Sequence, residues 1–314
     1  AINAASNLVT VTVKAGCETI KLVDAASSAL TNGNDGATLT STQYTTAFDN
    51  LLSNESWDVL LCPGDDTVTA VDAFATTMQG RVDSRATTNK MYGIVCLGCV
   101  SDEPIATMQA RGSAGKRLTL LAPSITYYPR YAPTTQLTLN GTYLACAYAG
   151  ILVANDVEIS PTRKVISITP QVDSGTGKKY YNNGEIETLL GAKVVPVSRI
   201  EGAVKVARGI TRIANSDDIE FEVNIVRIID YVKAQVQNKL DGFLGQPNLQ
   251  RIRDVIAGEC NGILQQDQLD EVIVAFKPTE VNIGASPDTI NVSMTIQPTF
   301  STNFINVTLA VSRL

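Results

Sequence analysis

The stretch GAVKVARGITRIANSDDIEFEVNIVRIIDYVKAQVQNKLDGFL, residues 202–244, carries a strand pattern, a polar turn and a helix pattern in succession. Val204 and Val206 alternate with small or basic residues, and two isoleucines follow a break at Gly209, as in a half-buried strand. From Asn224 onward the apolar residues recur at three- and four-residue steps, which predicts a long amphipathic helix. The apolar positions of this helix are Ile225, Ile228, Ile229, Val232, Val236, Leu240 and Phe243.

The opposite face of this helix is predicted to be polar. Its charged positions are Arg227, Asp230, Lys233, Lys239 and Asp241. The stretch contains no arrangement of side chains that is typical of catalysis. We therefore interpret it as an element of assembly.

Charge is unevenly distributed across this region. Residues 193–212 hold five basic residues against Glu201 alone, namely Lys193, Arg199, Lys205, Arg208 and Arg212. Residues 213–230 are acidic apart from Arg227, through Asp217, Asp218, Glu220, Glu222 and Asp230. Two interpretations are open: a solvated surface, or complementary patches that set the register of one subunit on another.

Length and composition exclude several classes of protein. The chain has 314 residues, which is enough for two ordinary domains. Its net charge of −6 argues against bulk binding of nucleic acid, which needs clustered lysine and arginine. No run of eighteen apolar residues occurs, so no membrane insertion is predicted. The first residues lack the features of a signal peptide and a starting methionine, and we interpret them as a processed or cut end.

The residues needed for common catalytic sites are missing. The chain has no histidine, which excludes Ser-His-Asp and Cys-His catalysis. Asp65 and Asp66 suit a helix cap better than a cation site, and GSAGKR at 112–117 lacks phosphate-loop spacing. The scattered cysteines, interpreted as buried residues of a reducing compartment, are Cys17, Cys62, Cys96, Cys99, Cys146 and Cys260. Cys96 and Cys99 have zinc or redox spacing but no second pair to complete a site. We predict no enzyme, no cofactor and no metal.

Strands and helices alternate in the first half of the chain. The patterns predict strands at 57–64, 91–98 and 117–123, separated by helices at 67–88 and 103–110. Such alternation implies crossover connections and a mainly parallel sheet. The pattern predicts a loop over 124–138 and a small-residue helix over 142–155, whose alanine-rich face suggests close packing on a neighbour.

The second half mixes helices with antiparallel strands. A short helix, a hairpin that turns at Glu201 and Gly202, and the long helix are followed by a helix over 247–266 and strands over 289–298 and 304–312. The predicted fold class is therefore α/β plus α+β. The predicted divisions are a remnant of a preceding β-rich segment at 1–28, an α/β domain with a mainly parallel sheet at 29–158, and an α+β C-terminal domain at 159–314.

Three segments, in the same order, resemble the contractile tail sheath proteins of myophages, R-type bacteriocins and related injection machines. They are TNGNDGATLTSTQYTTAFDNLLSNESWDVLLCPGDD (31–66), NGTYLACAYAGILVANDVEISPTRKVIS (140–167), and the region 182–240 with its Gly-Ala-Val-Lys-Val-Ala-Arg-Gly strand and Arg-Ile-Ile-Asp helix. Members of that family begin with an N-terminal arm and further strands. Only about thirty residues precede the Gly/Asp turn here, so we expect a chain that lacks its arm.

The resemblance implies a mechanical function. Subunits of the family polymerise helically around an inner tube, and contraction drives the tube through a target envelope. The implied partners are further copies of the chain, the tube protein, and baseplate and tail terminator proteins. The implied location is the virion tail, assembled in the bacterial host cytoplasm, and the domain at 159–314 is implied to be the sheath core that faces the tube.

The resemblance also suggests contact residues. The candidates for meeting the tube or the next subunit are Lys193, Arg199, Lys205, Arg208 and Arg212, with Asp217, Asp218 and Glu220 as the acidic counterpart. Neighbouring subunits of the family share strands. The candidates for strand sharing are Phe304, Ile305, Val307, Leu309 and Val311. A non-sheath structural module, such as a baseplate component or a surface or adhesin domain, is the alternative.

Overall fold

The computed structural model describes residues 46–47, 49–50, 58–61, 67–88, 90–112, 114–129, 134, 136–215 and 218–303. Several predictions fall outside these residues. They concern the segment 1–28, the Gly/Asp turn at 31–36, Asp65 and Asp66, Asp217, and the strand at 304–312.

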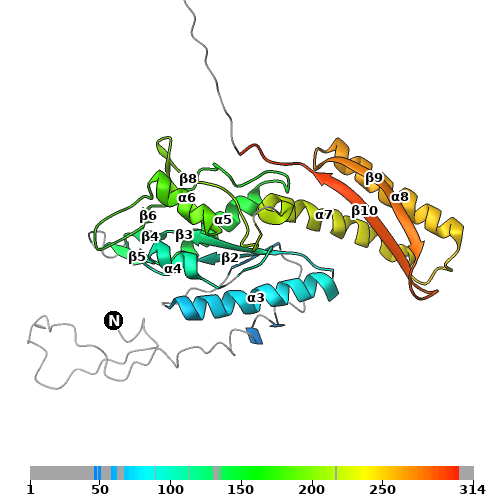
Figure 1. Cartoon of the computed structure of the whole chain (residues 1–314), viewed down its shortest axis with the longest axis horizontal. Coiled ribbons are helices and arrows are strands. Elements are labelled where there is room, and N and C mark those ends of the chain that lie inside the picture. The colour runs from blue at the N-terminus through cyan, green and yellow to red at the C-terminus, as the bar shows by residue number, and fades with distance from the viewer. Residues whose placement is uncertain are drawn as a thin grey trace, which may run out of the picture. The chain divides into compact units, whose positions relative to one another are not determined.

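A five-stranded sheet is the centre of the fold (Figure 1). Its order is β1 (Val59–Leu61), β2 (Ile94–Gly98), β3 (Leu118–Ala122), β7 (Val194–Ile200) and β8 (Ala203–Val206). The first four strands are parallel and β8 is antiparallel to β7. Every residue of β2 and β3 is buried, as expected for parallel strands covered on both faces. The predicted mixed fold with a mainly parallel sheet is confirmed.

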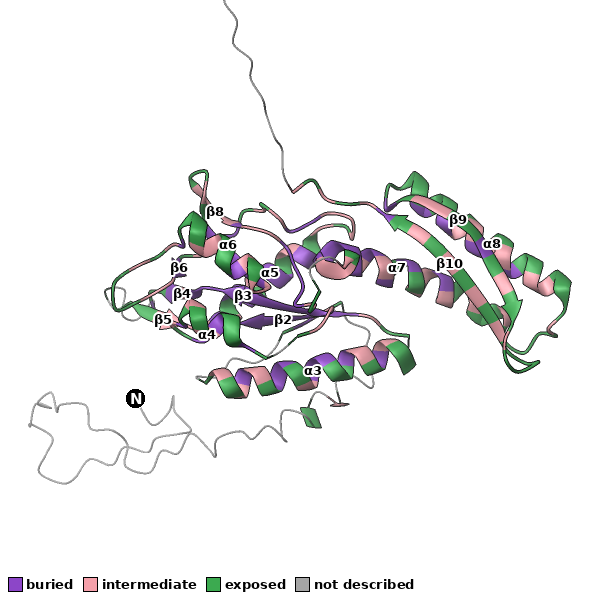
Figure 2. Cartoon of the chain, in the orientation of Figure 1, coloured by how far each residue is buried: buried purple, intermediate pink, exposed green. Residues whose placement is uncertain are grey.

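Helices cover the two faces of this sheet. Val95 and Leu97 of β2 belong to a core that includes residues of α3 (Val68–Thr88), α4 (Ile105–Ala110) and α6 (Asn183–Gly191). Ile94 and Cys96, which alternate with them, belong to a second core with α5 (Thr142–Ala154). Figure 2 shows the buried strands between these helices. Alternate side chains of one strand therefore bind two different helical layers to the sheet.

The hairpin of β7 and β8 completes the sheet. Glu201 and Gly202 both have positive φ, 53° and 85°, as a two-residue hairpin turn of matching twist requires. The hairpin predicted from the sequence is confirmed. Both strands come from beyond residue 158, and β7 nevertheless pairs with β3 along three residues.

The loop predicted over 124–138 is wrong in part. Ser124–Tyr127 form β4, which pairs with β5 (Leu137–Leu139) and β6 (Pro170–Gln171) in a small antiparallel sheet. The inward side chains of β4 are polar: the Ser124 hydroxyl donates to the Gln171 carbonyl at 2.7 Å, and the Thr126 hydroxyl donates to Gln171 Oε1 at 2.9 Å. Because hydrogen bonds replace apolar contacts here, the usual alternation of a strand is inverted, with the polar residues buried and the apolar ones more exposed.

The C-terminal elements form a third core. The long helix predicted from Asn224 is α7 (Val223–Leu240), and the next helix is α8 (Gln250–Leu269). They pack with an antiparallel pair, β9 (Ile273–Ile283) and β10 (Ile290–Pro298). Strand β9 was not predicted, because Lys277, Pro278 and Glu280 interrupt its apolar pattern. A short 3-10 helix, η1 (Ile219–Phe221), leads into α7.

Candidate functional site

The outer end of the β7–β8 hairpin carries two of the predicted contact residues. Lys205 Nζ lies 2.6 Å from Glu201 Oε2 across the turn, and this hydrogen bond lowers the pKa of Glu201 below its ordinary value. Arg199 is exposed, and its Nε donates to the Gly202 carbonyl at 3.4 Å. The hairpin end therefore leaves the Arg199 side chain exposed at the surface of the chain.

The basic and acidic stretches meet within the chain at Phe221. Arg208 Nη2 lies 2.7 Å from Glu222 Oε1, and its guanidinium carbon lies 5.3 Å from the centroid of the Phe221 ring. Lys193 Nζ lies 6.0 Å from the same ring. Cations over an aromatic face are held by the ring's negative charge distribution. Arg208 thus stabilises the segment that directly precedes α7, through contacts within the chain.

The acidic residues that precede α7 are also partly neutralised by contacts within the chain. The Asp218 side chain accepts a hydrogen bond from the Glu220 backbone N–H at 2.9 Å and so caps η1. Glu220 forms an ion pair with Lys116 at 3.1 Å. Lys116 comes from the connection between β2 and β3, so this pair joins the turn to the sheet.

Arg212 lies inside the fold. It is 5% exposed, and its Nη2 donates to the Arg111 carbonyl at 3.0 Å. Burial lowers the pKa of Arg212 from its ordinary value. Its guanidinium lies beside the buried network described next.

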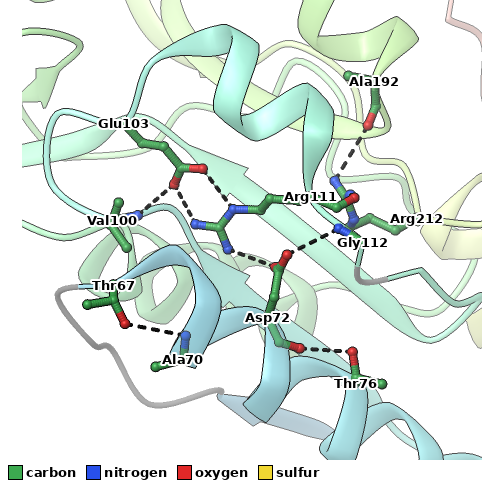
Figure 3. Close-up of polar contacts among 10 residues, drawn as sticks. All are labelled: Thr67, Ala70, Asp72, Thr76, Val100, Glu103, Arg111, Gly112, Ala192 and Arg212. Carbon is green, nitrogen blue, oxygen red and sulfur yellow. Dashed lines mark hydrogen bonds and ion pairs between the residues drawn. The ribbon is translucent and has the colours of Figure 1, made fainter.

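A buried ion-pair network joins α3 to the segment between β2 and β3 (Figure 3). Arg111 Nε donates to Glu103 Oε1 at 2.8 Å, and the same guanidinium pairs with Asp72 of α3 at 3.3 Å. The side chains of Arg111 and Glu103 are 0% exposed. Glu103 also accepts the Val100 N–H at 2.9 Å, and Asp72 accepts the Gly112 N–H at 3.1 Å. These bonds compensate the desolvation of the charges.

A second network involves α7 and corrects one prediction. Asp230, assigned to the polar face of the helix, is 6% exposed and forms two bonds with Arg117, of 2.9 and 2.5 Å. Arg117 also pairs with Asp83 of α3 at 3.0 Å. The helical period places Asp230 among polar positions, but the Arg117 side chain extends from the start of β3 to cover it. The sequence offers one signal for this: an arginine directly before five buried residues.

The cysteines do not form a reactive centre in the described part of the chain. Cys96, Cys99 and Cys260 are buried and Cys146 is exposed. Burial raises the pKa of both Cys96 and Cys99 to about 12, so these thiols stay protonated. Within the described ranges no group of three or more His, Cys, Asp or Glu is arranged to hold a metal.

Comparison with solved structures then identifies the fold. A chain of the helical sheath of the anti-feeding prophage in its contracted state superposes with a TM-score of 0.65 at 13% identity, over 86% of this chain and 74% of that chain. A chain of the baseplate of the same prophage gives a TM-score of 0.64 at 13% identity, over 86% and 73%. The sheath tail protein of Desulfitobacterium hafniense gives 0.62 at 16% identity, over 88% of this chain and 61% of that chain.

The chain has the fold of contractile sheath proteins. The resemblance drawn from the sequence is thus confirmed at the level of the fold. No family model matches the chain, and no curated protein does. This chain spans 61% of the length of the Desulfitobacterium protein. No helix in the part of the chain that the structure describes is long and apolar enough to cross a membrane.

Proposed function

We propose that this chain is a subunit of a contractile sheath that polymerises helically around an inner tube and contracts to drive the tube through a target envelope. The observation that carries the proposal is the match over 86% of the chain to a helical sheath in its contracted state. The polymer would belong to a phage-like tail assembled in the host cytoplasm, with baseplate and terminator proteins at its ends.

The buried networks support a subunit that moves as a rigid body. Arg117 joins α3, β3 and α7, and Arg111 joins α3 to the β2–β3 connection. A sheath that changes length by exchanging one set of subunit contacts for another needs units that hold their internal packing. The work of contraction would then come from the difference between two arrangements of the same subunits, without catalysis.

Electron microscopy of the purified chain tests the proposal directly. We expect hollow helical tubes, either from the chain alone or after addition of its tube protein. A chain that stays monomeric in both conditions at high concentration would contradict a sheath function. The match to a chain of a baseplate favours a second candidate, a baseplate component. Closed rings without helical growth would support that candidate.

Arg199 and Lys205 at the hairpin end are our proposed contacts with the tube or with a neighbouring subunit. Reversal of both charges, R199E with K205E, is expected to reduce tube-templated assembly at least tenfold, because like charges then face the partner. The measurement is the amount of sheath pelleted with tubes. The variant K179E/R251E, with the same change in net charge elsewhere on the surface, serves as the control. Equal pelleting of all three proteins would exclude these contacts.

The C-terminal segment is our proposed shared strand. Phe304, Ile305, Val307, Leu309 and Val311 would pair with a sheet of the adjacent subunit. Deletion of residues 304–314 is expected to abolish polymers while leaving the circular dichroism and thermal melt of the subunit unchanged. Filaments of normal length from the truncated chain would refute strand sharing.

A further inference from the structure

A cleft of about 560 Å³ lies beside the C-terminal half of α7. One wall is apolar and includes Val236, Leu240 and Met294. The lining also includes four basic residues, Lys90, Lys116, Arg117 and Lys233. Lys116 and Arg117 are paired with carboxylates, whereas Lys90 and Lys233 are exposed and form no ion pair with any described residue. We call this surface the basic cleft; it suits an apolar side chain flanked by acids.

An apolar side chain flanked by acidic residues lies at the end of α8. Leu269, the last residue of the helix, is 71% exposed, and Asp270 and Glu271 follow it, both exposed. We call these three residues the acidic corner. Asp270 accepts only the neutral amide of Gln266, at 3.0 Å, among the described residues, so its charge is not compensated.

The acidic corner is held in place by backbone bonds. The Asp270 N–H donates to the Gln266 carbonyl at 2.9 Å, and the Thr299 hydroxyl donates to the Glu271 carbonyl at 2.6 Å. A fixed protrusion loses less conformational entropy on binding than a flexible one. The corner is therefore suited to docking.

The cleft and the corner lie at opposite ends of the β9–β10 pair. Ile290, which lines the cleft, pairs with Ile283, whereas Pro298 pairs with Ile273 next to the corner. Seven strand residues lie between Ile290 and Pro298, so the two are eight steps, or roughly 25 Å at about 3.3 Å a residue, apart. Along β10 the corner lies beyond the last residue that lines the cleft, Met294, by the four steps to Pro298. Two complementary surfaces at different places on one subunit make a head-to-tail contact, which repeats into a ring or an open helix.

We propose that the acidic corner of one copy docks in the basic cleft of the next copy. Leu269 would lie on the apolar wall, with Asp270 and Glu271 near Lys90 and Lys233. This inference deepens the proposed sheath function, on which it rests, because it names the contact between successive subunits. The occupant is a second copy rather than another protein because the acidic corner, on the same chain, combines an apolar side chain with charges opposite to those of the basic cleft.

Charge exchange provides the first test. The variants K90E/K233E and D270K/E271K are each expected to reduce polymer formation more than tenfold in sedimentation and electron microscopy. Their combination in one chain restores opposite charges and is expected to return polymer yield to within about twofold of the original chain. K90R/K233R, which keeps both charges, serves as the matched control, and thermal melts check that each variant folds.

Cross-linking provides a second test that does not depend on polymers. A carbodiimide joins a lysine amine to a carboxylate in direct contact. In a mixture of ¹⁴N- and ¹⁵N-labelled chains at high concentration, we expect mixed-isotope peptides that join Lys90 or Lys233 to Asp270 or Glu271. These links without any helical polymer would support the contact and contradict the sheath function.

Three results would overturn the inference. The first is normal polymer from both charge-reversed variants, which would leave the sheath function intact and place the contact elsewhere. The second is loss of polymer that the combined variant does not restore. The third is the absence of mixed-isotope links, including the case in which the lysines link only to an added tube protein.

Discussion

Replacement of Arg117 by alanine is expected to lower the free energy of unfolding by about 3–5 kcal/mol. The substitution leaves the Asp230 carboxylate, 6% exposed, without the two hydrogen bonds that it receives from Arg117. It also releases Asp83 on α3, whose side chain is 43% exposed and contributes less. Urea unfolding at neutral pH, followed by circular dichroism, measures the loss.

The pH dependence of this loss separates an unpaired charge from lost packing. Burial already raises the pKa of Asp230, while the bonds to Arg117 oppose that shift. Without Arg117 the pKa rises further. A carboxyl with a raised pKa in the folded state stabilises the fold fully below its unfolded pKa, about 4, and loses that contribution as the pH rises through the folded value. The deficit of R117A should therefore be smaller at pH 5 than at pH 7.5. An equal deficit at both values would show that only packing was lost.

Two control variants test whether the unpaired buried charge causes the stability loss of R117A. R117M/D230L replaces both charges by apolar side chains, and we expect it to recover most of the stability because no buried charge is left. K239A, also on α7, removes one partner of the exposed ion pair that Lys239 forms with Glu259 of α8 at 3.1 Å, and should cost less than about 1 kcal/mol. A large loss in K239A would mean that charge on α7 matters in general rather than at the buried pair.

The sequence was sufficient to predict the elements whose apolar residues recur with the same period as their buried positions. Helix α7 buries Ile225, Ile228, Val232 and Val236, at the steps read from the sequence. Strands β2 and β3 are mostly apolar, are buried at every position and lie between two helical layers. The turn of the β7–β8 hairpin was predictable because Gly202 takes the positive φ that favours glycine.

Elements stabilised by polar contacts were not predictable in this way. Strand β4 directs Ser124 and Thr126 inward to Gln171, which lies more than forty residues further along the chain. Asp230 is a charged residue that the fold buries. Its burial could not be predicted from the local sequence, because its partner Arg117 is 113 residues away. A periodic pattern reports which residues avoid water, and it does not report which distant charge will neutralise a buried one.

The candidate contact residues show the same limit. The sequence showed a basic stretch followed by an acidic one, and the fold pairs Arg208 with Glu222 and Glu220 with Lys116. These pairs use charges that were otherwise available to a partner. Lys90, Lys233 and the acidic corner form no such pairs with the residues that the structure describes, and no local pattern distinguished them. The fold brings Lys90, which lies between α3 and β2, to the same cleft as Lys233 of α7.

The contact between the end of β2 and the start of α5 depends on glycine at two positions. The Gly141 N–H donates to the Cys99 carbonyl at 2.7 Å, and the Cys99 N–H donates to the Leu121 carbonyl at 2.9 Å. A Cβ atom added at Gly98 would lie 2.0 Å from the Gly141 carbonyl carbon and 2.1 Å from the Thr142 nitrogen. Both neighbours are backbone atoms, so no side chain can rotate to make room.

Replacement of Gly98 by alanine is therefore expected to cost about 3 kcal/mol or more, at or above the upper range for an added methyl group in a core. Relief of the clash would move α5 away from β2, and that movement would break the Gly141–Cys99 bond. Urea unfolding measures the loss, and hydrogen exchange of the Gly141 amide reports whether that bond opens.

Gly150 in α5 is the matched control, since an added Cβ there meets nothing within 4 Å. G150A should raise stability by about 0.5–1 kcal/mol, because alanine is the better helix former. If G98A were as stable as the original chain, β2 and α5 could separate without loss, and the sheet would not depend on this backbone contact.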